Sequence, residues 1–229
     1  WSPRISGIGV RLAYGAPDSD KPQPSPDASL TPTLWSGSID FDRGPLYLTA
    51  AYERHEDFQP LNTLLGVANA TDGRDEAWKI GGSYAWGSLK VAAAFETLEY
   101  EASSLASQTV SALVGPGTRG VTYEVQNLYL AATYTTGPHV LALTYAYKSD
   151  DELNSSDIAN SASQQVSVRW GYNFSKRTQV YAMATRINND ANAFQTFGVN
   201  PLGATVPLGL SSARGADPTG IGAGIVHSF

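Results

Sequence analysis

The side chains that could carry out chemistry are widely separated along this chain. Three histidines, His55, His139 and His227, stand far apart, and none has a partner at metal-ligand spacing, so no metal site is predicted. The glycines at 220–224 are a weak match to a phosphate-binding loop, because neither a helix nor a Lys-Ser/Thr pair follows them. The acidic stretch at 150–152 has the groups to bind divalent ions loosely, but a solvated loop is the favoured interpretation. Paired carboxylates or Ser/His pairs at a loop rim are not found, so neither an enzyme nor a cofactor is expected.

Most of the other charged side chains sit inside segments in which polar and apolar residues alternate. Alternation with a period of two places all polar residues of a strand on one face. A rigid wall of mixed charge keeps water in a channel and sets the field that a passing ion meets. Arg169 and Lys90, near mid-strand, are the favoured functional residues, although each charge could simply be solvated or paired. The predicted water-facing set is Arg11, Asp40, Glu53, Lys79, Lys90, Glu96 and Arg169.

The elements that position these charges are predicted to be about ten antiparallel strands. The least regular of them, at 180–187, places Arg186 in phase with apolar residues, which suggests a bulge or a rim position. The alternating segments are residues 7–14, 33–42, 46–53, 78–86, 89–96, 127–134, 140–148, 165–174, 180–187 and 219–229.

The connections between the predicted strands alternate strictly between very short and long. Tight turns are expected at 43–45, 87–88, 136–138 and 175–176, and long loops after every other strand, among them 16–31, 105–120 and 189–217. All tight turns therefore lie at one end of the sheet and all long loops at the other. That asymmetry is typical of outer-membrane barrels, whereas a soluble β-sandwich with Greek-key connections does not need it.

Aromatic residues gather near strand ends on the apolar face, as expected for rings that prefer the lipid headgroup level. The predicted girdle consists of Tyr14, Trp86, Tyr134, Tyr145, Tyr172 and Phe174. The last strand is apolar on one face, carries small residues on the other and ends on Phe229, which suits a sheet that closes in lipid. Its glycines would let a side chain or a neighbouring subunit approach closely.

Composition narrows the class of protein. Charged residues make up 16% of the 229, below the ~25% of typical soluble domains. No apolar run approaches the ~18 residues of a membrane-spanning helix, so a membrane span would have to be a β-barrel. A net charge of -6 argues against nucleic acid as a partner, and the absence of cysteine excludes disulfides and thiolate metal sites.

Residues 170–182 (WGYNFSKRTQVYA), Asn188-Asn-Asp190 and residues 219–229 (TGIGAGIVHSF) are similar to the C-terminal hairpin and last strand of the Gram-negative general porin family. Residues 1–10 (WSPRISGIGV) are similar to the turn that follows their sixth strand. The family often has Arg on the water-facing side of the last strand, where this chain has Val226 and Ser228.

The resemblance implies an all-β, transmembrane, antiparallel up-and-down β-barrel in the outer membrane of a Gram-negative bacterium. Members of the family are sixteen-stranded homotrimers through which small hydrophilic solutes and ions diffuse passively. Residues 1–229 would form one β-barrel domain that holds strands seven to sixteen and lacks the N-terminal strands, with Phe229 as the assembly signal. A free-standing ten-stranded barrel is the competing architecture. The alternative function is a structural or adhesive outer-membrane barrel whose long loops bind a partner.

Overall fold

In a computed structural model, the described residues (2–15, 33–56, 71–104, 121–197 and 214–229) form one antiparallel β-sheet. None of these residues belongs to a helix long and apolar enough to cross a membrane. The strands are β1 (Ile8–Gly15), β2 (Thr33–Arg43), β3 (Leu46–Glu56), β4 (Thr71–Trp86), β5 (Leu89–Ser104), β6 (Val121–Thr136), β7 (His139–Lys148), β8 (Asp151–Leu153), β9 (Ser156–Ile158), β10 (Ser163–Asn173), β11 (Thr178–Asn189) and β12 (Thr219–His227).

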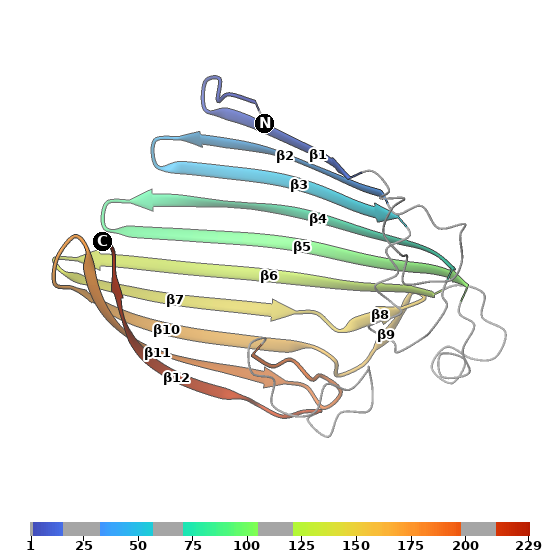
Figure 1. Cartoon of the computed structure of the whole chain (residues 1–229). Coiled ribbons are helices and arrows are strands. Elements are labelled where there is room, and N and C mark those ends of the chain that lie inside the picture. Colours follow the sequence, from blue (N-terminus) through green and yellow to red (C-terminus); the bar gives the residue numbers. More distant parts are fainter. Residues whose placement is uncertain (1, 16–32, 57–70, 105–120, 198–213) are drawn as a thin grey trace.

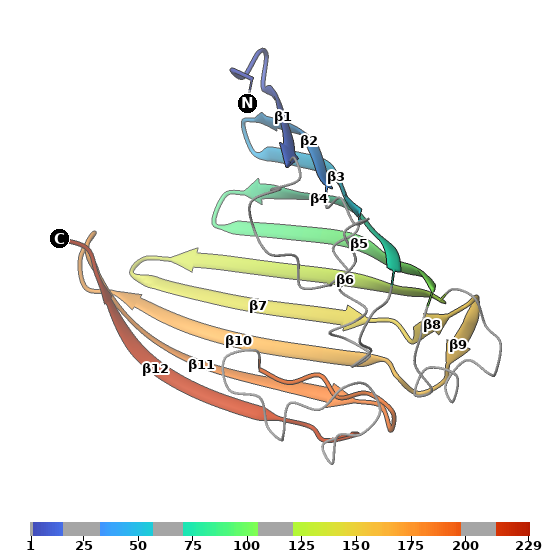
Figure 2. The same cartoon turned by 45° about the vertical axis from the view of Figure 1, so that its right-hand side comes forward.

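Ten of the strands form a meander, in which each strand pairs with the next of these ten along the chain. The order is β1-β2-β3-β4-β5-β6-β7-β10-β11-β12, and the short β8–β9 hairpin pairs with the outer end of β6. The sheet curls through an arc with β1 and β12 as its two edges (Figures 1 and 2). In the described residues β1 and β12 do not pair, so the ten strands do not close on themselves.

Tight turns and long connections lie at opposite ends of the sheet, as the sequence predicts (Figure 1). Gly44, Gly87 and Gly137 occupy the turns after β2, β4 and β6 with φ values of 61°, 57° and 53°. Backbone with positive φ is readily adopted only by glycine, and its twist matches that of the paired strands. We refer below to the turn end and the loop end of the sheet.

One face of the sheet is apolar and largely uncovered. Trp35, Leu143 and Trp170 on this face are 55%, 50% and 42% exposed. The hydrophobic residues buried in the described part of the chain are only Tyr123, Val125, Ala162, Ile187 and Ala193. A soluble domain of this size would bury its large apolar side chains, so this face is built to meet an apolar medium.

Two details differ from the sequence prediction, and a third selects the rim position over the bulge, the two alternatives for Arg186. Strands β4, β5 and β6 are each 16 residues long and extend well into stretches predicted as loops. The long connection expected between the predicted strands 140–148 and 165–174 contains the β8–β9 hairpin, whose turn residues Asn154 and Ser155 both have positive φ. The ladder of β11 runs without a bulge, and Arg186 lies at its outer end, 3.0 Å from Asp217.

Candidate functional site

The candidate site is the polar face of the sheet, opposite the apolar face. All seven residues predicted to meet water lie on it, because each has apolar-face residues as its immediate neighbours along the strand. One row of directly opposed residues crosses nine strands of this face, and we call it the polar row. It consists of Arg11, Ser38, Ala51, Lys79, Glu96, Asn127, Lys148, Ser163 and Asn189.

Lys79 and Glu96, predicted independently from two strands, face each other in the polar row. Their Nζ and Oε1 atoms are 2.6 Å apart. The amide of Asn127 also donates to Glu96, at 3.4 Å. These two charges thus neutralise each other on the wall.

Asp40 is shielded from solvent. It is only 2% exposed, with Arg4 Nη2 2.5 Å and Arg11 Nη2 3.5 Å from its carboxylate oxygens. Gly9 lies opposite it, and a Cβ there would come within 3.1 Å of the carboxylate. Arg4 precedes the first strand, so alternation in the sequence gave no sign that it folds back onto Asp40. Of the predicted charges, Asp40 is therefore the one least available to a solute.

Glu53 belongs to a cluster near the loop end of β3 and β4. His55 Nε2 is 3.0 Å from Glu53 Oε1, and His55 Nδ1 is 3.9 Å from Asp75 Oδ2. Burial raises the pKa of Asp75 to about 7. The sequence did not predict Asp75 as a site residue, because it lies in a stretch without alternation. No group of three His, Asp or Glu side chains in the described ranges is arranged to hold a metal ion.

The glycines of β12 accommodate large side chains that lie across the polar face. A Cβ at Gly224 would be 2.7 Å from the hydroxyl of Tyr181, and one at Gly220 would be 3.3 Å from the ring of Phe197. This confirms that small residues here let a side chain approach. Phe197 also shows that the start of the connection after β11 lies against the polar face.

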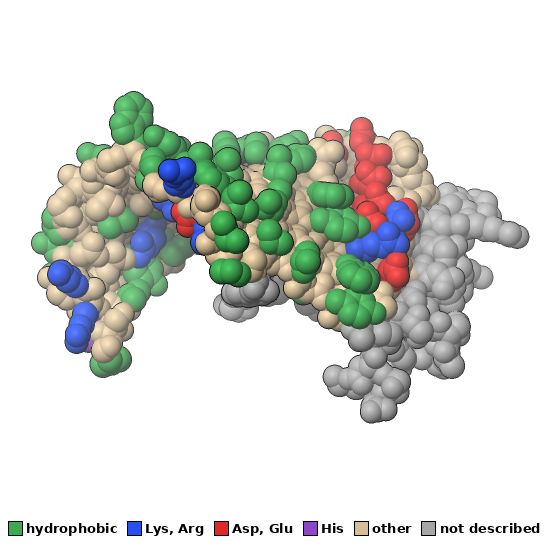
Figure 3. All heavy atoms as spheres, turned by 90° about the horizontal axis from the view of Figure 1, so that it is seen from above, with side chains coloured by type: hydrophobic (Ala, Val, Ile, Leu, Met, Phe, Trp, Pro, Cys, Tyr) green, Lys and Arg blue, Asp and Glu red, His purple; other side chains and the backbone are tan. Residues whose placement is uncertain are grey.

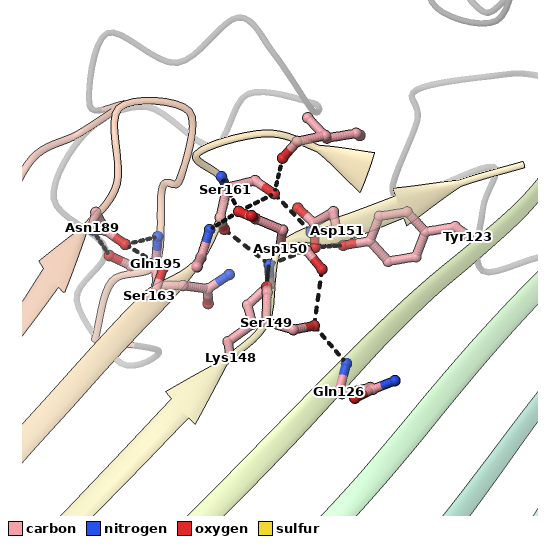
Figure 4. A network of polar contacts seen from close by, with 12 residues as sticks. Tyr123, Gln126, Lys148, Ser149, Asp150, Asp151, Ser161, Ser163, Asn189 and Gln195 are labelled. Atoms are coloured by element: carbon pink, nitrogen blue, oxygen red, sulfur yellow. Dashed lines mark hydrogen bonds and ion pairs between the residues drawn. The ribbon is translucent and has the colours of Figure 1, made fainter. Parts of the chain in front are cut away.

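The connection between β7 and β10 is fixed by a buried polar network (Figure 4). Asp151, 4% exposed, lies 2.5 Å from Lys148 Nζ and accepts a hydrogen bond of 2.5 Å from the Tyr123 hydroxyl. Asp150 accepts hydrogen bonds from the backbone N–H groups of Ser161 and Ala162, at 2.7 and 2.8 Å. Burial and the neighbouring Asp151 raise the pKa of Tyr123. Two carboxylates of the acidic stretch thus stabilise the loop rather than forming a solvated patch.

Aromatic side chains flank the apolar face at both ends. At the loop end, Tyr14 packs on Trp35 with ring centroids 4.5 Å apart. At the turn end, Tyr172 packs on Phe174 at 5.0 Å, and Trp86 is 80% exposed.

The remaining predicted aromatics also lie on this face. Tyr134 lies near the turn end of β6. Tyr145 lies nearer the loop end of β7, and its hydroxyl donates a hydrogen bond to Gln164. Phe229 is fully exposed and packs edge-on against His227 at 4.9 Å. Of the predicted girdle residues, Tyr14, Trp86, Tyr134 and Phe174 are thus exposed, whereas Tyr145 and Tyr172 are half-buried on the same face.

Beyond the loop-end aromatics, the same face carries a row of charges that the sequence analysis missed. Arg54, Glu76, Glu99, Glu124 and Glu152 lie directly opposite one another on adjacent strands. Figure 3 shows charged side chains gathered at this end of the sheet, beside the hydrophobic surface. The sequence did not single these residues out, because both faces of the strands are polar in this part.

The meander, the opposed faces and the asymmetric connections define a transmembrane antiparallel β-barrel protein. The sequence profile of the Gram-negative porins matches residues 1–192. The chain therefore belongs to the Gram-negative porin family and is a protein of the outer membrane.

Solved structures agree with this fold. An anion-selective porin from Comamonas acidovorans superimposes with a TM-score of 0.71 at 18% identity, covering 100% of this chain and 57% of that one. Two structures of OmpT from Vibrio cholerae, one folded in vitro and one expressed in the outer membrane, give TM-scores of 0.66 and 0.61. Their identities are 14% and 16%, with 99% and 98% of this chain and 62% of each OmpT chain covered. This chain thus spans about three fifths of the length of these porins. No curated protein sequence matches it.

Proposed function

We propose that this chain forms part of the wall of a passive outer-membrane channel for small hydrophilic solutes and ions. The observation that carries the proposal is the continuous register of ten strands, which keeps a charged, hydrogen-bonding face opposite a bare apolar face. In a membrane, the apolar face meets acyl chains and the polar face encloses water. Membership of the porin family supports the same function.

The unpaired edges of β1 and β12 support an arc that belongs to a larger barrel of one domain. Open strand edges leave backbone N–H and C=O groups without partners, which is strongly unfavourable in lipid. Further strands that pair with both edges would close the barrel. A homotrimer is proposed on the resemblance to general porins.

Roles follow for the residues that the sequence singled out. Arg11, Glu53, Lys79, Lys90, Glu96 and Arg169 are proposed to line the pore, with Asp40 holding Arg4 and Arg11 against the wall. The aromatic set at the two margins is proposed to lie at the headgroup level. Exposed Phe229 at the turn end is proposed as the signal for barrel assembly.

Conductance of the full-length protein in planar bilayers tests this function. We expect multi-step insertion with an ohmic current in KCl. The absence of any current from correctly folded protein would refute the channel.

A structural or adhesive barrel with a plugged lumen is the second candidate. The loops on which it depends, 16–31 and 105–120, lie outside the described residues, as does most of 189–217. Within the described part, Phe197 lies against the polar face, which favours partial filling of the lumen there. Deletion of a loop that abolished partner binding and left permeability unchanged would support this candidate.

A further inference from the structure

The cations on the polar face fall into two groups. Arg11, Lys79 and Lys148 each have a carboxylate within 3.5 Å, from Asp40, Glu96 and Asp151 respectively. Lys90 and Arg169 have no carboxylate partner among the described residues. The first group adds little net charge to the wall, and the second adds two full positive charges.

Both unpaired cations lie in one row of the ladder. Lys90 is opposite Thr133, Thr133 is opposite Ala142, and Ala142 is opposite Arg169. Three strand spacings of about 4.8 Å place their backbones roughly 14 Å apart along the wall. The row lies on the turn side of the polar row.

No acidic side chain counters them on this part of the wall. Between the row of Ser83 and Ala92 and the turn end, the polar face of β4–β12 in the described residues carries no Asp or Glu. Its side chains there are Ser, Thr, Asn, Gln, Tyr and small or apolar groups. The charge of Lys90 and Arg169 is therefore cancelled neither by a pair nor by a neighbour.

Arg169 is held in place by neutral groups. Its Nη2 donates to the side-chain oxygen of Gln179, and its guanidinium carbon lies 4.9 Å from the ring centroid of Tyr181. The Gln179 amide in turn donates to Asn173 at 2.6 Å. Gly171 makes room for this contact, because a Cβ there would lie 3.0 Å from Gln179 Cδ. These contacts fix the guanidinium without neutralising it, and in the described part of the chain its other N–H donors are left for a solute.

We propose that Lys90 and Arg169 form an anion-attracting band on the turn side of the channel, which makes small anions such as chloride, carboxylates and phosphate the favoured solutes. The proposal deepens the channel function above and rests on it. An anion entering the band meets uncancelled positive charge from two adjacent parts of the wall. Lys90 is exposed to solvent, which keeps each contact weak enough for the anion to leave, as conduction requires.

The test is the reversal potential of the full-length protein in a planar bilayer under a KCl gradient. At a distance of about 6 Å in water of physiological ionic strength, one charge changes the local anion concentration by about twofold. Lys90→Gln and Arg169→Gln are each expected to lower the chloride-to-potassium permeability ratio by about twofold, and the double variant by about fourfold. Neither side chain has an ionic partner among the described residues, so neither variant leaves a carboxylate of that part of the chain unpaired.

Gln179→Glu tests the same charge without removing it. The new carboxylate would pair with Arg169, so we expect a decrease in the permeability ratio comparable to that of Arg169→Gln. Lys176→Gln, in the β10–β11 turn, is the matched control. It removes one positive charge outside the wall and is expected to leave the ratio unchanged.

The outcomes separate the two proposals. Variants that conduct with the permeability ratio of the parent protein would refute the anion band and leave the channel intact. A shift in Lys176→Gln as large as that in Arg169→Gln would also refute it, because the effect would then follow total charge. A parent protein that folds but carries no current would refute the channel itself.

Discussion

Replacement of Leu143 by arginine should strongly destabilise the protein, whereas the same change at the adjacent Thr144 should not. Leu143 lies on the apolar face of β7, midway between His139 and Tyr147. Four residues at about 3.3 Å each, on a strand tilted by roughly 40°, place it about 10 Å in depth from either residue. That is near the centre of an apolar band about 25 Å tall.

The expected difference follows from what each side chain faces. An arginine on the lipid face at the bilayer midplane costs about 2–4 kcal/mol in outer-membrane barrels. Thr144 points to the polar face, where the small residues Ala131 and Ser167 lie opposite it. An arginine there can reach water, so its cost should be below about 1 kcal/mol.

Equilibrium unfolding in phospholipid vesicles, followed by the fluorescence of the five tryptophans, measures both changes. The reasoning would be refuted if Thr144→Arg destabilised the protein as much as Leu143→Arg. The polar face would then be dry and the apolar face would not meet lipid.

Three further changes test local features. Gly224→Leu should lower the free energy of unfolding by about 1–3 kcal/mol, because its Cβ would lie 2.7 Å from the Tyr181 hydroxyl. Burial raises the pKa of Asp75 from 3.8 to about 7, so its contribution to stability is complete below pH 3.8 and is lost as the pH rises through 7. Asp75→Asn should therefore reduce the decrease in stability between about pH 4 and 7, measured by denaturant titration at each pH. Glu124→Gln should raise stability at pH 8 by about 0.5 kcal/mol, because Glu124 lies opposite Glu152 and its pKa is raised by burial and by that neighbour.

Each of these changes has a contrary outcome. Ala223→Leu, one residue earlier on the apolar face, is the control for Gly224→Leu, and equal losses would contradict the steric explanation. An unaltered pH profile in Asp75→Asn would show that another group titrates. A less stable Glu124→Gln would show that the carboxylate is attracted to its surroundings rather than repelled.

Wherever one face of a strand is apolar, the sequence was sufficient to predict the fold. Residues 78–86 alternate so regularly that the two faces of β4 follow from the period of two alone. Gly44, Gly87 and Gly137 marked the turns, since a tight turn between twisted strands requires positive φ. These are local properties of the chain, and they also placed Lys90 and Arg169 on the polar face.

Alternation fails as a signal where both faces of a strand are polar. Residues 71–77 continue β4 through contacts with its neighbour, such as Arg74 to Glu99 at 3.2 Å and to Glu101 at 2.8 Å. Such pairing depends on the register between strands, and no pattern within one strand encodes it.

The sequence by itself determined which side chains share a face and at which end of the sheet the turns lie. Only the tertiary structure decided which of the polar-face charges are cancelled. Arg4 reaches Asp40 by folding back from before the first strand, and Lys79 meets Glu96 because two strands align in one register. Within the described ranges Lys90 and Arg169 have no acidic partner, because the residues opposite them are Thr133 and Ala142. The physical reason is that the face of a side chain follows from the geometry of its own strand, whereas its ionic partner is set by chain segments distant in the sequence.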